Sequence, residues 1–200
     1  GQLRRAAGGI SGAPREHWLA ILVADLDGYS RVCTAVEPEV LWDVMTDWWR
    51  HVADAVYSEM GWLNKVDGDG VMALFGLHTG ADIPSASAAT CALLIAEHFA
   101  GYADAMDVLR DNKVGIRLGF EAGDVVAGVT VLGPQPVYDV LGRAVNFAFQ
   151  LSDTAQSNAI LAGPNVHDRT EDAFDYERFG EIAVKGTEER ALAYRLLGRL

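Results

Sequence analysis

Two short apolar runs on either side of an Asp-Gly repeat constrain the fold of this chain more than any other feature. Residues 62–66 and 71–75 are rich in apolar side chains, and residues 67–70 between them read Asp-Gly-Asp-Gly. An Asp-Gly pair between two β-prone runs favours a tight turn, because glycine adopts the positive φ that such turns require. The segment therefore predicts a β-hairpin with an aspartate at its tip.

Other periodic segments place this hairpin in an α+β fold. Residues 18–24 form a continuous apolar run, which predicts a buried strand. Residues 38–60 and a segment from Ser85 or Ser87 to about residue 109 carry apolar side chains at helical spacing. We also expect two strands joined near Gly123 (114–120 and 125–131), a helix (141–155), a short strand (159–161) and a terminal strand pair (179–184 and 192–196). This order predicts a ferredoxin-like α+β domain with a central, mostly antiparallel sheet and flanking helices.

The first long helix and the hairpin contain most of the tryptophans. Trp42, Trp48 and Trp49 lie on the helix, and Trp62 opens the hairpin. Helical spacing of large apolar side chains is typical of packing, so we expect these rings in the core or against a second subunit.

Two aspartates end or interrupt these apolar segments. Asp25 stands where the run 18–24 ends, and Asp69 lies at the tip of the predicted hairpin. Two fixed carboxylates repel each other unless a cation lies between them, and Mg²⁺ or Mn²⁺ prefers oxygen ligands that it can share with phosphates. The pair therefore indicates a divalent-metal site, although either segment alone is also typical of an ordinary turn.

The charge balance limits the partners of the chain. Sixteen Lys and Arg residues stand against 28 Asp and Glu residues, which gives a formal net charge of −12. Such a surface repels nucleic acid and anionic lipid, so we expect neither partner. A substrate with several phosphates is repelled as well, unless metals or local cations reverse the field.

Cysteine content and the N-terminal segment indicate the compartment. Cys33 and Cys91 are far apart and form no disulfide framework, which favours reduced thiols in the cytoplasm. No apolar run approaches the roughly 20 residues of a membrane span. We expect residues 1–16 to be a linker or a remnant of cloning and residues 17–200 to form the domain. A linker would allow this to be the cytoplasmic domain of a longer protein.

Five motifs in one order give the chain a resemblance to a known family. They are VADLDGYS (23–30), KVDGDGVMALFG (65–76), RLGFEAGDVVAGV (117–129), YDVLGRAVNFA (138–148) and VKG (184–186). They resemble the patterns FxDIxGFT, KxxGDxxMA, RxGxxxGxVxxG, YDxxGxxVNxAxR and KG of class III adenylate and guanylate cyclases. The resemblance extends from about residue 18 to residue 197. It implies an enzyme that closes a nucleoside triphosphate into a 3′,5′-cyclic monophosphate and releases pyrophosphate.

The resemblance also implies roles for the acidic pair and for the residues that select the base. Asp25 and Asp69 match the positions that bind two divalent metal ions, whereas Asp27 does not. Lys65 and Asp139 match the positions that recognise the base, and a lysine donor with an aspartate acceptor suits the edge of adenine. The resemblance therefore favours ATP as substrate and cyclic AMP as product.

The remaining matches concern the ribose, the phosphates and the oligomer. Asn146 matches the residue that orients the ribose, and Lys185 matches a lysine that contacts the terminal phosphates. In the family each site lies between two subunits. The resemblance thus implies a homodimer with two equivalent sites, in which the metal aspartates of one copy work with the substrate-binding residues of the other.

One catalytic position departs from the family pattern. The motif in residues 138–148 is followed in the family by an arginine, and this chain has Gln150 there. Glutamine donates a hydrogen bond but brings no charge to the phosphate in the transition state, which commonly costs on the order of 10²-fold in rate. Arg143, on the same predicted helix, could approach from another angle but is more typical of a surface residue.

The departure leaves two other functions open. One is a cyclase-homology module with weak or no catalysis, which the presence of both metal aspartates disfavours. The other is a cyclase of the bacterial antiphage type that uses CTP or UTP, which the adenine-type pair Lys65 and Asp139 disfavours. Restoring arginine at position 150 should raise turnover if Gln150 is the deficit.

Overall fold

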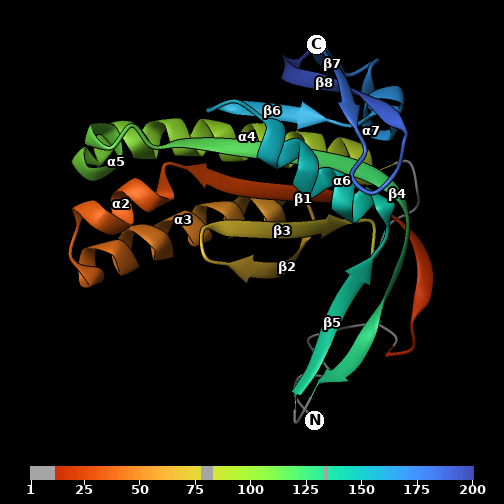
Figure 1. Ribbon diagram of the computed structural model, residues 1–200, viewed down its shortest axis with the longest axis horizontal. Helices are drawn as coiled ribbons and strands as arrows, with labels where there is room; N and C mark the ends of the chain where they lie inside the picture. The colour runs from red at the N-terminus through yellow and green to blue at the C-terminus, as the bar shows by residue number, and fades with distance from the viewer. Residues whose placement is uncertain (1–11, 78–82, 133–134) are drawn as a thin grey trace.

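An eight-stranded sheet forms the centre of the protein, and helices cover both of its faces (Figure 1). The computed structural model describes residues 12–77, 83–132 and 135–200. The strands are β1 (Arg15–Asp27), β2 (Trp62–Asp67), β3 (Gly70–Phe75), β4 (Gly115–Leu132), β5 (Gln135–Leu141), β6 (Ala159–Ala162), β7 (Phe174–Ala183) and β8 (Arg190–Arg199). The helices are α2 (Tyr29–Ala35), α3 (Pro38–Ser58), α4 (Pro84–Ala105), α5 (Asp107–Asp111), α6 (Arg143–Thr154) and α7 (Pro164–Thr170).

The sheet is mixed, with β1 near its middle. The strand order is β2-β3-β1-β4-β6-β8-β7, and β5 pairs with the distal part of β4. β4 and β6 run parallel, and the other neighbouring strands are antiparallel. Residues 19–24 of β1 are at most 3% exposed, because strands flank β1 and helices cover both its faces. A strand covered on both faces has a continuous apolar sequence, which is the pattern that predicted β1.

The two faces of the sheet are covered by different helices. Trp48 of α3 and Ile95 of α4 belong to one buried cluster together with Ala24 of β1. Val23, the neighbour of Ala24, lies in a second cluster with Ala148 of α6. Side chains alternate along a strand, so α3 and α4 cover one face and α6 covers the other. The predicted α+β class, with a mostly antiparallel sheet and flanking helices, is confirmed.

Gly119 of β4 allows α6 to approach the sheet closely. A Cβ at this position would lie 2.2 Å from the backbone nitrogen of Ser152 and 2.5 Å from the carbonyl oxygen of Ala148. Any larger residue would push the helix away from the strand. The glycine therefore fixes the height of α6 above β4.

Several predicted elements need correction. The strands predicted at 114–120 and 125–131 are one continuous strand, β4, because Gly123 stays extended and pairs with Leu19 of β1. The helix predicted to end near residue 109 divides at Met106, whose φ of −107° and ψ of 107° are not helical. The sequence also missed β5 and the two seven-residue helices α2 and α7.

A long β-ribbon projects away from the rest of the protein. It consists of the distal part of β4 and all of β5, and Figure 1 shows it extending beyond the sheet. Its exposed apolar side chains include Val131 and Leu141, each 69% exposed, together with Val126 and Val137. These side chains give the ribbon an apolar surface that is available to a partner. A partner would also stabilise the ribbon, because an isolated two-stranded ribbon is only marginally stable in water.

Two further expectations concern the linker at residues 1–16 and the crossing of a membrane. Residues 1–11 of the expected linker lie outside the described residues, and Arg15 and Glu16 already pair with β4 as the start of β1. None of the helices in the described ranges combines the length and the hydropathy that crossing a membrane requires.

Candidate active site

Asp25 lies at the end of β1, on the sheet face that α6 covers. Strand alternation places it on the same face as Val23, which packs against α6. Its partner in the antiparallel ladder is Arg117 of β4. The Asp25 side chain is 24% exposed, so the carboxylate is held at the edge of the core and remains open to solvent.

Asp69 lies in the turn between β2 and β3 and meets Asp25 there. One carboxylate oxygen accepts a hydrogen bond from the backbone N–H of Leu26 at 3.3 Å. The two carboxyl groups are in hydrogen-bonding contact, and Asp69 has a pKa raised to about 6, first by burial and then by this contact and the repulsion from Asp25. The prediction that the hairpin tip faces the end of the first strand is therefore correct in geometry.

The carboxylate pair, defined as Asp25 and Asp69, fits a divalent cation. Burial and the neighbouring Asp25 disfavour the ionised form of Asp69, and a cation between the two carboxyl groups offsets that cost. Among the described residues, no group of three or more His, Cys, Asp or Glu side chains is arranged to hold a metal. Mg²⁺ commonly uses one or two carboxylates and completes its shell with water and phosphate oxygens, so a pair of carboxylates is sufficient.

Arg117 lies beside the carboxylate pair. Its guanidinium donates a hydrogen bond to Asp25 at 2.6 Å, and its side chain is 29% exposed. This arginine brings positive charge to the site, a contribution that the sequence analysis missed. The available signal was its place as the first residue of the third motif, but only the register of β1 and β4 reveals its partner.

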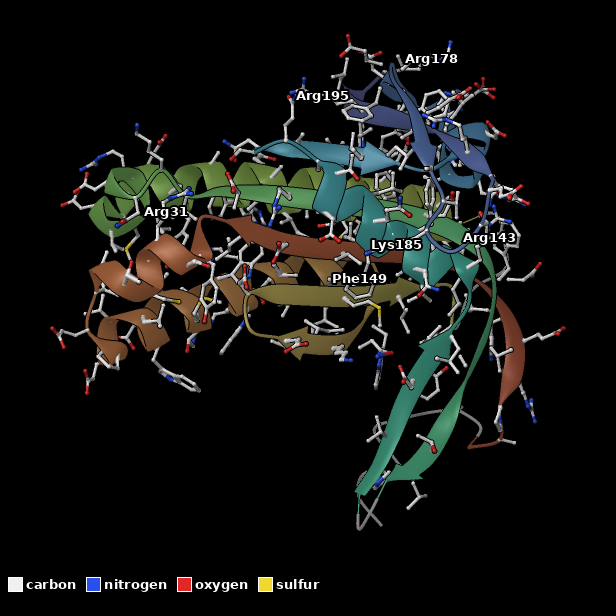
Figure 2. The ribbon with its side chains drawn as sticks, viewed as in Figure 1. Arg31, Arg143, Phe149, Arg178, Lys185 and Arg195 are labelled. Carbon is white, nitrogen blue, oxygen red and sulfur yellow. The ribbon has the colours of Figure 1, made fainter. Side chains whose placement is uncertain are left out.

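A polar groove, defined by Asn146, Gln150 and Lys185, lies along the outer side of α6. The cavity has a volume of about 420 Å³, and Phe149, Asp153 and Gly186 complete its lining. Figure 2 shows Lys185 and Phe149 close together, with Lys185 carried by the loop between β7 and β8. The structure therefore brings together three residues that the sequence assigned to the ribose, the phosphates and the transition state.

Gln150 is held by the loop between β7 and β8. Its side-chain amide donates a hydrogen bond to the carbonyl of Ala183, and its oxygen accepts one from the backbone N–H of Lys185 at 3.1 Å. Arg143, the first residue of α6, pairs with Glu189 of that loop. Arg143 is therefore directed to the loop, and α6 is linked to the segment that carries Lys185 at two places.

Lys65 and Asp139 lie on separate strands and are both exposed. Lys65 is opposite Met72 in the hairpin, and Asp139 is opposite Gly128 in the projecting ribbon. One carboxylate oxygen of Asp139 accepts a hydrogen bond from the backbone N–H of Val140 at 2.9 Å. In the described part of one chain, no ion pair joins Lys65 to Asp139.

Glu121 is a buried acid outside this site. It is 3% exposed, and burial raises its pKa to about 7. Its carboxylate accepts hydrogen bonds from the backbone N–H groups of Ala122, Asn165 and Val166. Because these bonds satisfy the carboxylate at the start of α7, Glu121 connects β4 to α7.

Comparison with known proteins identifies the family. The profile described as "Adenylate and Guanylate cyclase catalytic domain" matches residues 13–198. An adenylate cyclase of Mycobacterium tuberculosis (strain ATCC 25618 / H37Rv) is 30% identical over 181 residues, which cover 90% of this chain and 39% of that protein. The chain thus spans well under half the length of this relative.

Solved structures share the fold. The adenylyl cyclase CyaB from P. aeruginosa superposes with a TM-score of 0.83 at 22% identity, covering 92% of this chain and 96% of that one. The guanylate cyclase domain of RhGC from Catenaria anguillulae, in complex with GTP, gives a TM-score of 0.82 at 18% identity, covering 93% and 100%. The profile match over nearly the whole chain and the 30% identical relative show the family: the chain belongs to the adenylate and guanylate cyclase catalytic domains.

Proposed function

We propose that this chain converts ATP into 3′,5′-cyclic AMP and pyrophosphate at a site shared by two copies. The observation that carries the proposal is the contact between Asp25 and Asp69, with Arg117 beside them, on the sheet face that α6 also covers. Burial and the neighbouring Asp25 disfavour the ionised form of Asp69, and a bound cation offsets this cost. The experiment that tests the proposal is incubation of the purified protein with Mn²⁺ and ATP, followed by identification of the cyclic product by mass.

The reaction is an in-line displacement at the α-phosphorus. The ribose 3′-oxygen forms a bond to this phosphorus, and the bond from the phosphorus to the oxygen that bridges to the β-phosphate breaks. The electron pair of the broken bond goes to the leaving pyrophosphate, and the 3′-hydroxyl proton passes to water. Two divalent ions, Mg²⁺ or Mn²⁺, held by the carboxylate pair would supply the Lewis acidity that favours the 3′-alkoxide and offsets phosphate charge. Asp25 is held by Arg117 and Asp69 by the backbone N–H of Leu26, so both carboxyl groups are in place before substrate arrives.

The other residues bind and orient the nucleotide. Lys65 donates to the ring N1 of adenine and Asp139 accepts from its exocyclic amine. Asn146 orients the ribose, and Lys185 contacts the terminal phosphates. Arg117 is 29% exposed beside the pair and supplies positive charge to the triphosphate in a chain whose net charge is −12. Local cations of this kind make a polyphosphate substrate compatible with an acidic protein.

Two features of the structure support a shared site. Lys65, Asp139, Asn146 and Lys185 are all exposed in the single chain, although each is assigned to substrate. The projecting ribbon of β4 and β5 also carries exposed apolar side chains that a second copy would cover. Contact between two copies would enclose both sets of residues and form two sites by symmetry.

Mixing two inactive variants should restore activity. Asp25→Asn damages one side of the shared site and Asn146→Ala damages the other, so a mixed dimer keeps one intact site. With free exchange half of the dimers are mixed, and we expect about a quarter of wild-type activity, since C2 symmetry gives two sites per dimer. The measurement is cyclic AMP formation after the variants are incubated together.

The matched control is a mixture of Asp25→Asn with Asp69→Asn. These two changes lie on the same side of the site, so no mixed dimer contains an intact site. Activity in both mixtures, or in neither, would contradict a site shared in the proposed way.

Gln150→Arg should raise turnover about tenfold. A guanidinium aimed at the α-phosphate contributes on the order of 10²-fold, whereas the lost hydrogen bond from Lys185 N–H costs roughly tenfold or less. The measurement is turnover at saturating ATP and Mn²⁺ for wild type, Gln150→Arg and Gln150→Ala. A fall in turnover for Gln150→Arg would mean that the link from Gln150 to the Lys185 loop matters more than the missing charge.

The engagement of Gln150 also favours one second function. Because its amide is bonded to Ala183 and Lys185, it is directed to the loop and not to substrate. A cyclase-homology module with weak or no catalysis is therefore the alternative. This alternative would be identified by a wild type without measurable turnover and a Gln150→Arg variant that forms cyclic nucleotide.

A further inference from the structure

Two consecutive tryptophans of α3 hold the turn that carries Asp69. The indole N–H of Trp48 donates to the carbonyl of Asp69 at 2.8 Å, and that of Trp49 donates to the carbonyl of Gly68 at 3.0 Å. The ladder of the hairpin ends with the pairing of Asp67 and Gly70. The two carbonyls therefore belong to the turn beyond the ladder, where no strand partner would hold them.

The two indoles are themselves fixed in different ways. Trp48 is fully buried and packs edge-on against Phe99 of α4, with ring centroids 5.8 Å apart. Trp49 is partly exposed and packs edge-on against Trp42, also at 5.8 Å. The turn is thus joined to the core through one ring and to the outer surface of α3 through the other.

The position of this turn determines the position of the carboxylate. Gly68 has a φ of +61°, a conformation that glycine adopts without strain, so the turn residue itself adds little stiffness. Asp69 is held at its carboxylate by Leu26 N–H and at its carbonyl by Trp48. Hairpin tips are otherwise among the more mobile parts of a sheet, and a metal ligand must be placed to within a fraction of an ångström.

We propose that Trp48 and Trp49 are positioning residues that hold the Asp69 turn in the geometry needed to bind the cation with Asp25. This inference rests on the proposed function, because the metal-binding role of Asp69 is itself proposed. Both indoles bond to backbone carbonyls of the turn, so they act on the Asp69 carboxylate through the backbone.

Trp49→Phe is the test variant, and Trp42→Phe is its matched control. Both changes remove an indole N–H from the same helix, but of these two residues it is Trp49 that donates to the turn. Trp42 is 65% exposed, and phenylalanine at position 42 keeps an aromatic ring beside Trp49. Trp48→Phe is less informative, because Trp48 is fully buried and its loss also disturbs the core. Melting temperatures should show that both test and control variants are folded.

The first measurement is amide hydrogen exchange of residues 65–72 in the metal-free protein. We expect Trp49→Phe to speed exchange in this segment by about three- to tenfold, the effect of losing one hydrogen bond, and Trp42→Phe to leave it unchanged. Equal exchange in the two variants would overturn the inference. This measurement needs no catalysis, so it decides the question even if the wild-type chain forms no cyclic nucleotide and the proposed function fails.

The second measurement separates positioning from a merely structural contact. For Trp49→Phe we expect the Mn²⁺ concentration that gives half-maximal activity to rise about three- to tenfold, while turnover at saturating Mn²⁺ changes less than about twofold. Trp42→Phe should change neither. Faster exchange with an unchanged Mn²⁺ requirement would overturn the positioning role, because the turn would then be loosened without consequence for the cation.

Discussion

Asp25→Asn and Asp69→Asn should each lower cyclic nucleotide formation by at least about a hundredfold. An amide is a poor ligand for a hard divalent ion, and its N–H₂ group adds donors where the cation and the phosphates require acceptors. Asp25→Asn also removes the charge partner of Arg117. The measurement is the rate of product formation at saturating Mn²⁺ and nucleotide, with thermal unfolding of each variant recorded in parallel.

The thermal unfolding distinguishes lost chemistry from lost folding. Burial and the contact with Asp25 raise the pKa of Asp69 to about 6, so the ionised form of Asp69 is disfavoured in the folded chain. Asp69→Asn removes this repulsion, and we expect a melting temperature equal to or above that of the wild type. A variant that is inactive and at least as stable shows that the carboxylate is retained for function at a cost in stability.

Asp67→Asn is the matched control for this pair of variants. Asp67 lies in the same hairpin and is exposed, but it is not a member of the carboxylate pair. It should retain near-wild-type activity. Equal activity in Asp67→Asn, Asp69→Asn and wild type would contradict the metal assignment.

The base preference should change when both base-recognising residues change. Adenine offers an acceptor at N1 and a donor amine, whereas guanine offers a donor at N1 and an acceptor at O6. Lys65→Glu supplies the acceptor that guanine N1 needs. In the wild type, Asp139 Oδ1 lies 2.9 Å from the backbone nitrogen of Val140. Asp139→Asn keeps an oxygen for this bond and replaces the second carboxylate oxygen with an amide N–H₂ group, which can donate to guanine O6.

We expect each single change to lower turnover of ATP by about tenfold to a hundredfold and the double variant to prefer GTP. The measurement is kcat/KM for ATP and GTP in all four proteins. An unchanged ATP/GTP ratio in the double variant would show that Lys65 and Asp139 do not recognise the base. A wild type that already prefers GTP would contradict the adenine assignment before any substitution.

Local patterns explain how much of the fold could be predicted. The hairpin depends on an Asp-Gly turn between neighbouring runs, and β1 on one continuous apolar segment, so both could be identified from a few residues. β5 could not, because it is a strand only through its pairing with β4 in the projecting ribbon. The seven-residue helices α2 and α7 are too short to display a helical period.

The candidate site was predictable to the extent that its residues lie in family motifs. The closeness of Asp25 and Asp69 followed from paired acidic turns, and the grouping of Asn146 with Lys185 followed from the resemblance. The contacts that hold the site were not predictable. Arg117 meets Asp25 across 92 residues, a contact fixed by the register of β1 and β4.

The role of the tryptophans shows the same limit more sharply. Helical spacing predicted that their rings pack in the core or against a second subunit, and Trp48 is indeed fully buried. Spacing carries no information about where an indole N–H points. The bonds from Trp48 and Trp49 to the hairpin turn, 21 and 19 residues away, depend on how α3 packs against the hairpin.

Formation of cyclic AMP from ATP is the activity that we propose for this chain. The most direct test is incubation of the purified protein with Mn²⁺ and, separately, ATP, GTP, CTP or UTP, followed by identification of each product by mass and by comparison with 3′,5′-cyclic standards. We predict cyclic AMP and an equal amount of pyrophosphate from ATP, in excess of any product from the other three nucleotides. A cyclic product from a pyrimidine nucleotide would agree with the proposed chemistry but contradict the base assignment. No cyclic product from any of the four nucleotides would contradict the proposed function.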